Sequence, residues 1–202
     1  MKTYAIRKMK DGICWKDIPT LEIDHPYLDT PLSGISAHAR IAYDDEAILV
    51  NLFVEEKEIR AVETGPIGSP CEDSCLEFFF CPMEGDSRYF NIEFNSNGCM
   101  YLGFGTGIPD LVRLLPDENN HNFEPDIYKN ENGWGITYKI PFAFIRRFFK
   151  DFNVYEGKTI AANCYKCSDL TVPANYFSWN EVTGEPFTFH RPSCFGKMTF
   201  VV

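Results

Sequence analysis

Three short segments between residues 74 and 104 constrain the fold most, because apolar side chains recur in them at every second position. A period of two places successive side chains on opposite faces of a β-strand. The residues that this period places on one face of the first two segments are Leu76, Phe78, Phe80, Phe90, Ile92 and Phe94. The sequence therefore predicts antiparallel strands over residues 75–81, 89–95 and 99–104 that bury one face in a hydrophobic core.

The register of the third strand depends on the turn at Asn97 and Gly98, because a slip of one residue exchanges the two faces. A two-residue turn would place Tyr101 beside Phe94. A three-residue loop with Gly98 in the left-handed region instead places Tyr101 on the opposite face. We predict the three-residue loop, because it buries three apolar side chains of the strand. These are Met100, Leu102 and Phe104.

The opposite face of these strands is polar and carries Glu77, Asn91, Glu93 and Tyr101. If the strands pair so that their apolar faces align, Glu77 lies close to Glu93, and like charges opposite each other destabilise a sheet. A bound cation, a neighbouring Arg or Lys, a shared proton or a hydroxyl-rich ligand would each compensate. The alternative is a face open to water, where screening makes the repulsion small.

The rest of the chain predicts further strands and one helix. The strands are expected over residues 34–43, 46–55, 134–140, 159–167 and 196–202. Residues 141–151 form the expected helix, because Pro141 can open it and Phe142, Ile145 and Phe149 share one face. No linker, repeat or shift in composition marks a domain boundary. We therefore expect an all-β fold, an antiparallel β-sandwich with one short helix, in a single domain over residues 1–202.

Charge and hydropathy limit the partners of the chain. The formal net charge is −10, so a nucleic-acid backbone or an anionic membrane surface would repel the protein. The N-terminus lacks the apolar core of a secretory signal, and no uncharged run is long enough to span a membrane. A cytoplasmic protein is therefore expected, without nucleic-acid or membrane partners, and the sequence carries no signal for its oligomeric state.

The eight cysteines are expected to be free thiols. A core of this size does not need disulfides, and a protein without a secretory signal is not expected to form them. Cys164 and Cys167 form a Cys-x-x-Cys pair, but no second pair stands at zinc-ribbon spacing. We therefore interpret them as structural thiols.

Two stretches of the chain resemble the carbohydrate-binding module family 9-like domains, which are related in fold to DOMON domains. The first is Glu-Asp-Ser-Cys-Leu-Glu-Phe-Phe at 72–79, followed by Tyr-Phe-Asn-Ile-Glu-Phe-Asn at 89–95. The second is Ala-Asn-Cys-Tyr-Lys-Cys-Ser-Asp at 162–169, followed by Tyr-Phe-Ser-Trp at 176–179 and Phe-His-Arg-Pro at 189–192. The resemblance implies a jelly-roll type sandwich and non-catalytic binding of a mono- or oligosaccharide or a polysaccharide end.

The resemblance also implies how the sugar would be held. Family members grip it between two tryptophans, while polar side chains reach its hydroxyl groups. Trp179 stands at one of these positions, whereas Cys71 stands where the other tryptophan is expected, and Trp15 or Tyr101 is an alternative platform. The polar ligand residues that we expect are Glu77, Asn91, Glu93, Tyr101, Lys166, His190 and Arg191.

Several of these assignments have a structural alternative. The polar neighbours of Trp179 favour partial exposure, but large aromatic residues more often belong to a core. His190 and Arg191 can instead bond to carbonyls or carboxylates near the last strand. Lys166 is a candidate counter-charge on the polar face, or else forms an exposed ion pair with Asp169.

Other functions stay open on the sequence alone. One alternative is a glycosidase in which Glu77 and Glu93 are the two catalytic carboxyl groups. Cross-strand neighbours can approach the separation of about 5 Å that retaining enzymes need. The fold relation to DOMON domains implies haem binding as an alternative, and a cytosolic scaffold is a further one. The ligand types available for haem are His38, His121, His190, Met83 and Met100.

Structural calcium is a cofactor that some family members bind. The chain offers oxygen ligands of the type that calcium prefers, although their spacing matches no EF-hand. These acidic residues are Asp44, Asp45, Glu46, Glu72 and Asp73. The sequence therefore allows a structural calcium ion but assigns no ligands to it.

Overall fold

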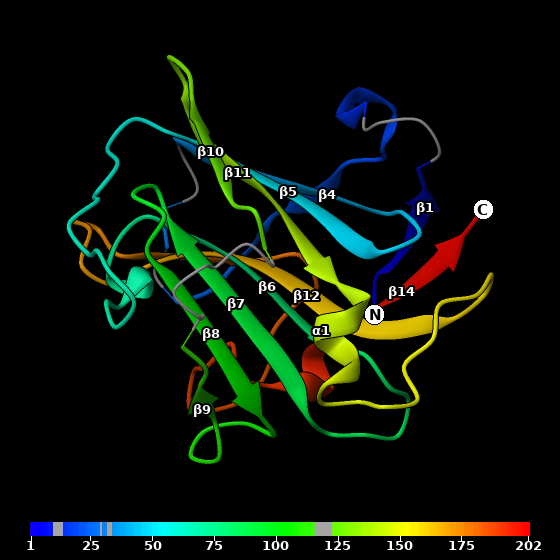
Figure 1. The fold of residues 1–202 in the computed structure, drawn as a ribbon. Coiled ribbons are helices and arrows are strands. Elements are labelled where there is room, and N and C mark those ends of the chain that lie inside the picture. The colour runs from blue at the N-terminus through cyan, green and yellow to red at the C-terminus, as the bar shows by residue number, and fades with distance from the viewer. Residues whose placement is uncertain (10–13, 29, 32–33, 116–122) are drawn as a thin grey trace.

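The computed structural model describes residues 1–9, 14–28, 30–31, 34–115 and 123–202, in which fourteen strands form one curled sheet (Figure 1). The strands are β1 (Thr3–Lys8), β2 (Leu21–Ile23), β3 (His25–Pro26), β4 (Ile35–Tyr43), β5 (Ala47–Glu56), β6 (Cys75–Cys81), β7 (Tyr89–Asn95), β8 (Met100–Gly105), β9 (Val112–Arg113), β10 (Asp126–Lys129), β11 (Gly133–Pro141), β12 (Thr159–Ser168), β13 (Asn175–Ser178) and β14 (Gly196–Val201). The helices are α1 (Phe142–Arg146) and the 3₁₀ turns η1 (Trp15–Asp17), η2 (Pro70–Glu72) and η3 (Pro192–Cys194).

The sheet folds into two layers that enclose the main core. Strands run in the order β10-β11-β5-β4-β1-β14-β12-β6-β7-β8-β9. Figure 1 shows β10, β11, β5 and β4 crossing over the layer that contains β12, β6, β7 and β8. The all-β class predicted from the sequence is therefore confirmed.

Strand β1 joins the two layers and makes the sheet mixed. It pairs in parallel with β14 over five residues and with β4 through Arg7 and Lys8. Its alternate residues Tyr4 and Ile6 are buried in the core. This parallel pairing is an exception within the antiparallel sandwich expected from the sequence, and the short, charged N-terminal segment supplies it.

The predicted apolar face of β6, β7 and β8 forms one wall of the main core. All six of its residues on β6 and β7 are fully buried. Met100, Leu102 and Phe104 pair with Phe94, Ile92 and Phe90, respectively. Gly98 has a φ of 80°, as the three-residue loop requires. The predicted register is therefore confirmed.

Helix α1 is shorter than the helix predicted from the sequence. It spans Phe142–Arg146 instead of residues 141–151, and the next amides bond to carbonyls three residues back. This tighter turn brings the neighbouring rings of Phe148 and Phe149 to Phe90, with centroids 5.2 and 5.8 Å away. Within the described residues, no helix is long and apolar enough to cross a membrane.

Candidate functional site

The outer face of β6, β7 and β8 carries a row of polar side chains. Glu77 on β6 pairs with Glu93 on β7, and Glu93 pairs with Tyr101 on β8. On its other side, Glu77 is the partner of Tyr165 on β12. The predicted sharing of one face by Glu77, Glu93 and Tyr101 is therefore confirmed.

This face is covered rather than open to water, because a second hydrophobic cluster packs on it. Only 2% of Glu77 and 5% of Glu93 is exposed. The aromatic part of the cluster is built by Phe79, Tyr89, Tyr165, Phe189 and Phe195. The alternative of a water-screened face is therefore wrong, and the carboxylates lie in a medium of low polarity.

A cavity of about 290 Å³ opens at the polar end of the face. Its volume is near the lower end of the range for small-molecule sites. Its lining residues are Ser69, Cys71, Glu93, Tyr101, Ile108, Pro109, Leu111 and His190. Three of the predicted ligand residues, namely Glu93, Tyr101 and His190, therefore meet at one cavity, together with Cys71.

Arg113, which the sequence analysis did not single out, fixes the Tyr101 wall of this cavity. Its guanidinium carbon lies 4.6 Å from the centroid of the Tyr101 ring, which is a cation–π distance. The same guanidinium donates to the carbonyls of Ile67, Gly68 and Met100 at 2.6–3.0 Å. No sequence motif marks Arg113, because the contact depends on how β9 folds back onto β8.

His190 also lines the cavity, and its ring contacts Tyr89. The Tyr89 hydroxyl and His190 Nδ1 are 2.8 Å apart. Burial lowers the pKa of His190 to about 4. The imidazole is therefore neutral at physiological pH and can exchange hydrogen bonds with an uncharged ligand.

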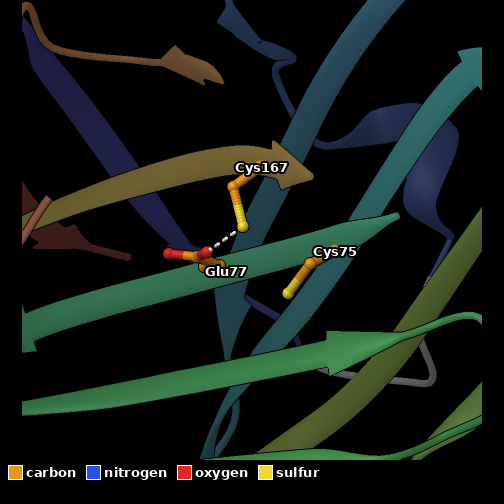
Figure 2. Close-up of side chains that lie close together, drawn as sticks. All are labelled: Cys75, Glu77 and Cys167. Atoms are coloured by element: carbon orange, nitrogen blue, oxygen red, sulfur yellow. Dashed lines mark hydrogen bonds between the residues drawn. The ribbon is translucent and has the colours of Figure 1, made fainter. Parts of the chain in front are cut away.

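The pKa values of the two carboxyl groups in this row, those of Glu77 and Glu93, are both raised. Burial raises the pKa of Glu93 to about 7. Burial, and then the Coulomb repulsion of Glu93, raises the pKa of Glu77 well above its usual value. Cys167 Sγ donates to Glu77 Oε1 at 2.7 Å (Figure 2). Two adjacent buried negative charges repel each other. Unless a cation neutralises them, protonation of the Glu77 and Glu93 carboxyl groups avoids this repulsion.

Lys166 does not provide that cation. Its strand partner is Leu76, which faces the main core, and its ammonium lies 3.1 Å from Glu56 Oε2. Lys166 is fully buried there. Both of its predicted roles, as a counter-charge on the polar face and as an exposed partner of Asp169, are therefore wrong.

Trp179 also lies inside the main core. Only 4% of it is exposed, which contradicts the expected partial exposure. Its ring packs edge-on against Tyr4 and is so close to Gly196 that a Cβ there would lie 2.5 Å from the indole. In this arrangement the indole offers no free face for a sugar, because core side chains cover it.

The other predicted ligand residues lie away from the cavity wall. Asn91 is fully buried on the same face as Glu93, and its amide has no hydrogen-bond partner among the described residues. Arg191 donates to the Pro186 carbonyl at 2.8 Å and does not line the cavity. Trp15, the alternative platform, packs with a small cluster around Leu49.

The residues considered for calcium and haem have other partners. Asp73 accepts from Arg60 and Asn95, and Asp45 pairs with Lys8. His38 lies on β4 beside Phe53. Met100 belongs to the main core, and His121 lies outside the described residues. Calcium and haem binding stay predictions from the sequence.

A second cavity, of about 580 Å³, is larger but carries none of the predicted ligand residues. It lies where Glu58, Ile59 and Arg60 face Thr171 and Val172. Size alone does not identify a site, and the smaller cavity combines polar groups with perturbed pKa values. The smaller cavity is therefore the candidate site.

Comparisons with known proteins identify the family to which this chain belongs. A family model described as carbohydrate-binding family 9 matches residues 11–200. A solved structure from Bacteroides uniformis ATCC 8492, provisionally named a carbohydrate-binding protein, is similar over 98% of this chain and 99% of its own, with 27% identity and a TM-score of 0.81. No curated protein matches the chain.

Two further solved structures are of a carbohydrate-binding module of family 9 from Caldicellulosiruptor kristjanssonii. The complex with glucose is 12% identical, covers 98% of this chain and 95% of its own, and has a TM-score of 0.66. The complex with cellotriose is 13% identical, covers 99% and 94%, and has a TM-score of 0.65. These two similarities concern the fold.

Proposed function

This chain belongs to carbohydrate-binding family 9, and from that premise we propose that it binds a neutral sugar without transforming it. The proposed ligand is a glucosyl unit, either free or at the end of an oligosaccharide. The proposed site is the cavity lined by Cys71, Glu93, Tyr101 and His190. The observation that carries the proposal is the convergence of Glu93, Tyr101 and His190 on this cavity.

The lining suits a sugar because it combines polar and apolar groups. A sugar ring presents apolar C–H faces and a rim of hydroxyls. Glu93, Tyr101 and neutral His190 supply acceptors and donors for hydroxyls, while Ile108 and Leu111 supply apolar contact. A negatively charged ligand would be disfavoured here, since the protein carries a net charge of −10.

The ligands of the similar structures support the choice of a glucosyl unit. The family 9 modules from Caldicellulosiruptor kristjanssonii were solved with glucose and with cellotriose. The two-tryptophan grip of the family is not reproduced in this chain, since Cys71 lines the cavity and Trp179 is buried. We therefore propose a shallower mode of binding, in which Tyr101 is the aromatic contact.

We propose binding without catalysis because Glu77 does not line the cavity. A glycosidase needs two carboxyl groups on either side of the scissile bond. Glu93 lines the cavity, whereas Glu77 does not line it and accepts a hydrogen bond from Cys167. A bound sugar would thus meet one carboxyl group, which suits binding better than hydrolysis.

Calorimetric titration with glucose, cellobiose and cellotriose, and with maltotriose and xylose for comparison, tests the proposal. Glu93→Gln and Tyr101→Ala are each expected to weaken binding at least tenfold, because each removes a hydrogen-bonding or stacking contact worth about 1.5 kcal/mol or more. Tyr155→Ala is the matched control, because that tyrosine is 61% exposed and lies outside the cavity. If no sugar binds at millimolar concentration, or if the control weakens binding as much, the proposal is wrong.

A further inference from the structure

Three potential metal ligands from two strands meet beside the candidate sugar site. Cys75 and Glu77 lie two residues apart on β6, so their side chains share a face, and Cys167 on β12 is the strand partner of Cys75. Two sulfur atoms and one carboxylate oxygen all lie within 4.8 Å of one another. Figure 2 shows Cys167 pointing from β12 toward Glu77, with Cys75 farther along the strand that carries Glu77.

The site is closed to water and adjoins a second buried carboxyl group, that of Glu93. Cys75, Glu77 and Cys167 are 0%, 2% and 3% exposed, respectively. Glu77 faces Glu93 across the strand pair. In the described part of the chain, no salt bridge reaches either carboxyl group, because Lys166 is paired with Glu56 and Arg113 bonds to carbonyls. No basic side chain of the described residues therefore competes with a cation for Glu77.

We propose that Cys75, Glu77 and Cys167 bind a thiophilic divalent cation of the zinc type. Thiolate sulfur selects zinc and related soft cations over calcium and magnesium, which prefer oxygen. In a tetrahedral zinc site the bond lengths of about 2.0–2.3 Å put neighbouring ligand atoms roughly 3.5–4 Å apart. The observed separations of at most 4.8 Å reach these values through small side-chain movements.

Three protein ligands leave the fourth position of such a cation for a further donor. On binding, each thiol releases its proton to solvent, since the thiolate is the ligand. Affinity should therefore rise with pH. The inference is independent of sugar binding, because no residue of the trio lines the sugar cavity.

Cobalt(II) is the direct probe, because its thiolate complexes absorb in the near ultraviolet and its tetrahedral complexes have intense visible bands. The full chain, reduced with a non-thiol reductant, is titrated with Co²⁺ and then with Zn²⁺. We expect one Co²⁺ per chain with both absorption features, and their loss when Zn²⁺ displaces it. Absence of the thiolate band in fully reduced protein overturns the proposal. It is also overturned if Cys75 and Cys167 form a disulfide and the protein takes up no metal after that disulfide has been reduced.

Variants locate the site. Cys75→Ser and Cys167→Ser should each abolish the thiolate band, and Glu77→Gln should weaken Co²⁺ binding at least tenfold. Glu77→Gln keeps the side-chain shape, so it carries the test if a serine variant fails to fold by circular dichroism. Cys81→Ser is the matched control, because Cys81 lies on the same face at the other end of β6 and is outside the trio. An unchanged band in Cys75→Ser and Cys167→Ser, or equal loss in Cys81→Ser, contradicts the assignment.

Discussion

Lys166→Met is expected to lower the free energy of unfolding by about 3–5 kcal/mol, because it leaves the buried Glu56 without its cation. Glu56 is 5% exposed and Lys166 is fully buried. The other carboxylate oxygen of Glu56 accepts from Ser74 Oγ and from Trp134 Nε1. These two donors are neutral, so they cannot replace the charge of the ammonium.

Urea unfolding of four proteins measures this effect: the wild type, Lys166→Met, Glu56→Gln and the double variant. The double variant should regain most of the stability lost in Lys166→Met, because it removes both charges together. Lys139→Met is the control, since Lys139 and Glu124 form an exposed pair worth less than about 1 kcal/mol. A loss below 1 kcal/mol in Lys166→Met, or no rescue in the double variant, would show that the buried pair is not coupled.

The metal-free protein is expected to lose stability as the pH rises from about 5 to 8, through the ionisation of Glu93 and Glu77. Burial raises the pKa of Glu93 to about 7 and that of Glu77 well above its usual value. In this window the unfolded chain releases protons that the folded chain keeps, so a higher pH favours unfolding. For Glu93 alone the difference is on the order of 3 kcal/mol, at about 1.4 kcal/mol per pKa unit.

Glu93→Gln isolates this contribution, because glutamine has a similar shape and does not ionise. Its unfolding free energy, measured with urea at pH 5 and pH 8 in the presence of a chelator, should fall less than that of the wild type. Glu58→Gln, an exposed carboxylate, should leave the wild-type slope unchanged. Identical slopes in the wild type and Glu93→Gln would contradict a raised pKa of Glu93.

The segment from β6 to β8 was predictable to within a residue, because one of its faces is entirely apolar. The period of two and the turn at Gly98 then left a single register that buries Met100, Leu102 and Phe104. That register was sufficient to place Tyr101 beside Glu93 on the polar face.

Strand β12 shows why the same method failed for Lys166. Nearly every residue of β12 is buried, so its two faces do not differ in polarity and the sequence does not reveal which side each residue occupies. Lys166 faces the main core only because β12 pairs with β6 in the observed register. Pairing between strands so distant in sequence is a tertiary property that no local pattern contains.

Two other failures have similar causes. β1 was missed because Thr3–Lys8 is short and its charged residues conceal the buried pair Tyr4 and Ile6. The exposure expected for Trp179 came from its polar neighbours Ser178 and Asn180, but these are also buried. Hydrogen bonds satisfy Asn180 inside the protein, since it donates to Asn163 Oδ1 and to the Cys194 carbonyl.

The central claim is that a neutral sugar binds in the cavity between Cys71, Glu93, Tyr101 and His190. The most direct test is the change in backbone amide chemical shifts when cellotriose is titrated into the isotope-labelled protein. We predict that the largest changes occur at the lining residues, including Cys71, Tyr101 and Leu111. Changes confined to Ile59, Arg60 and Thr171, which line the larger cavity, or no changes at millimolar sugar, would contradict it.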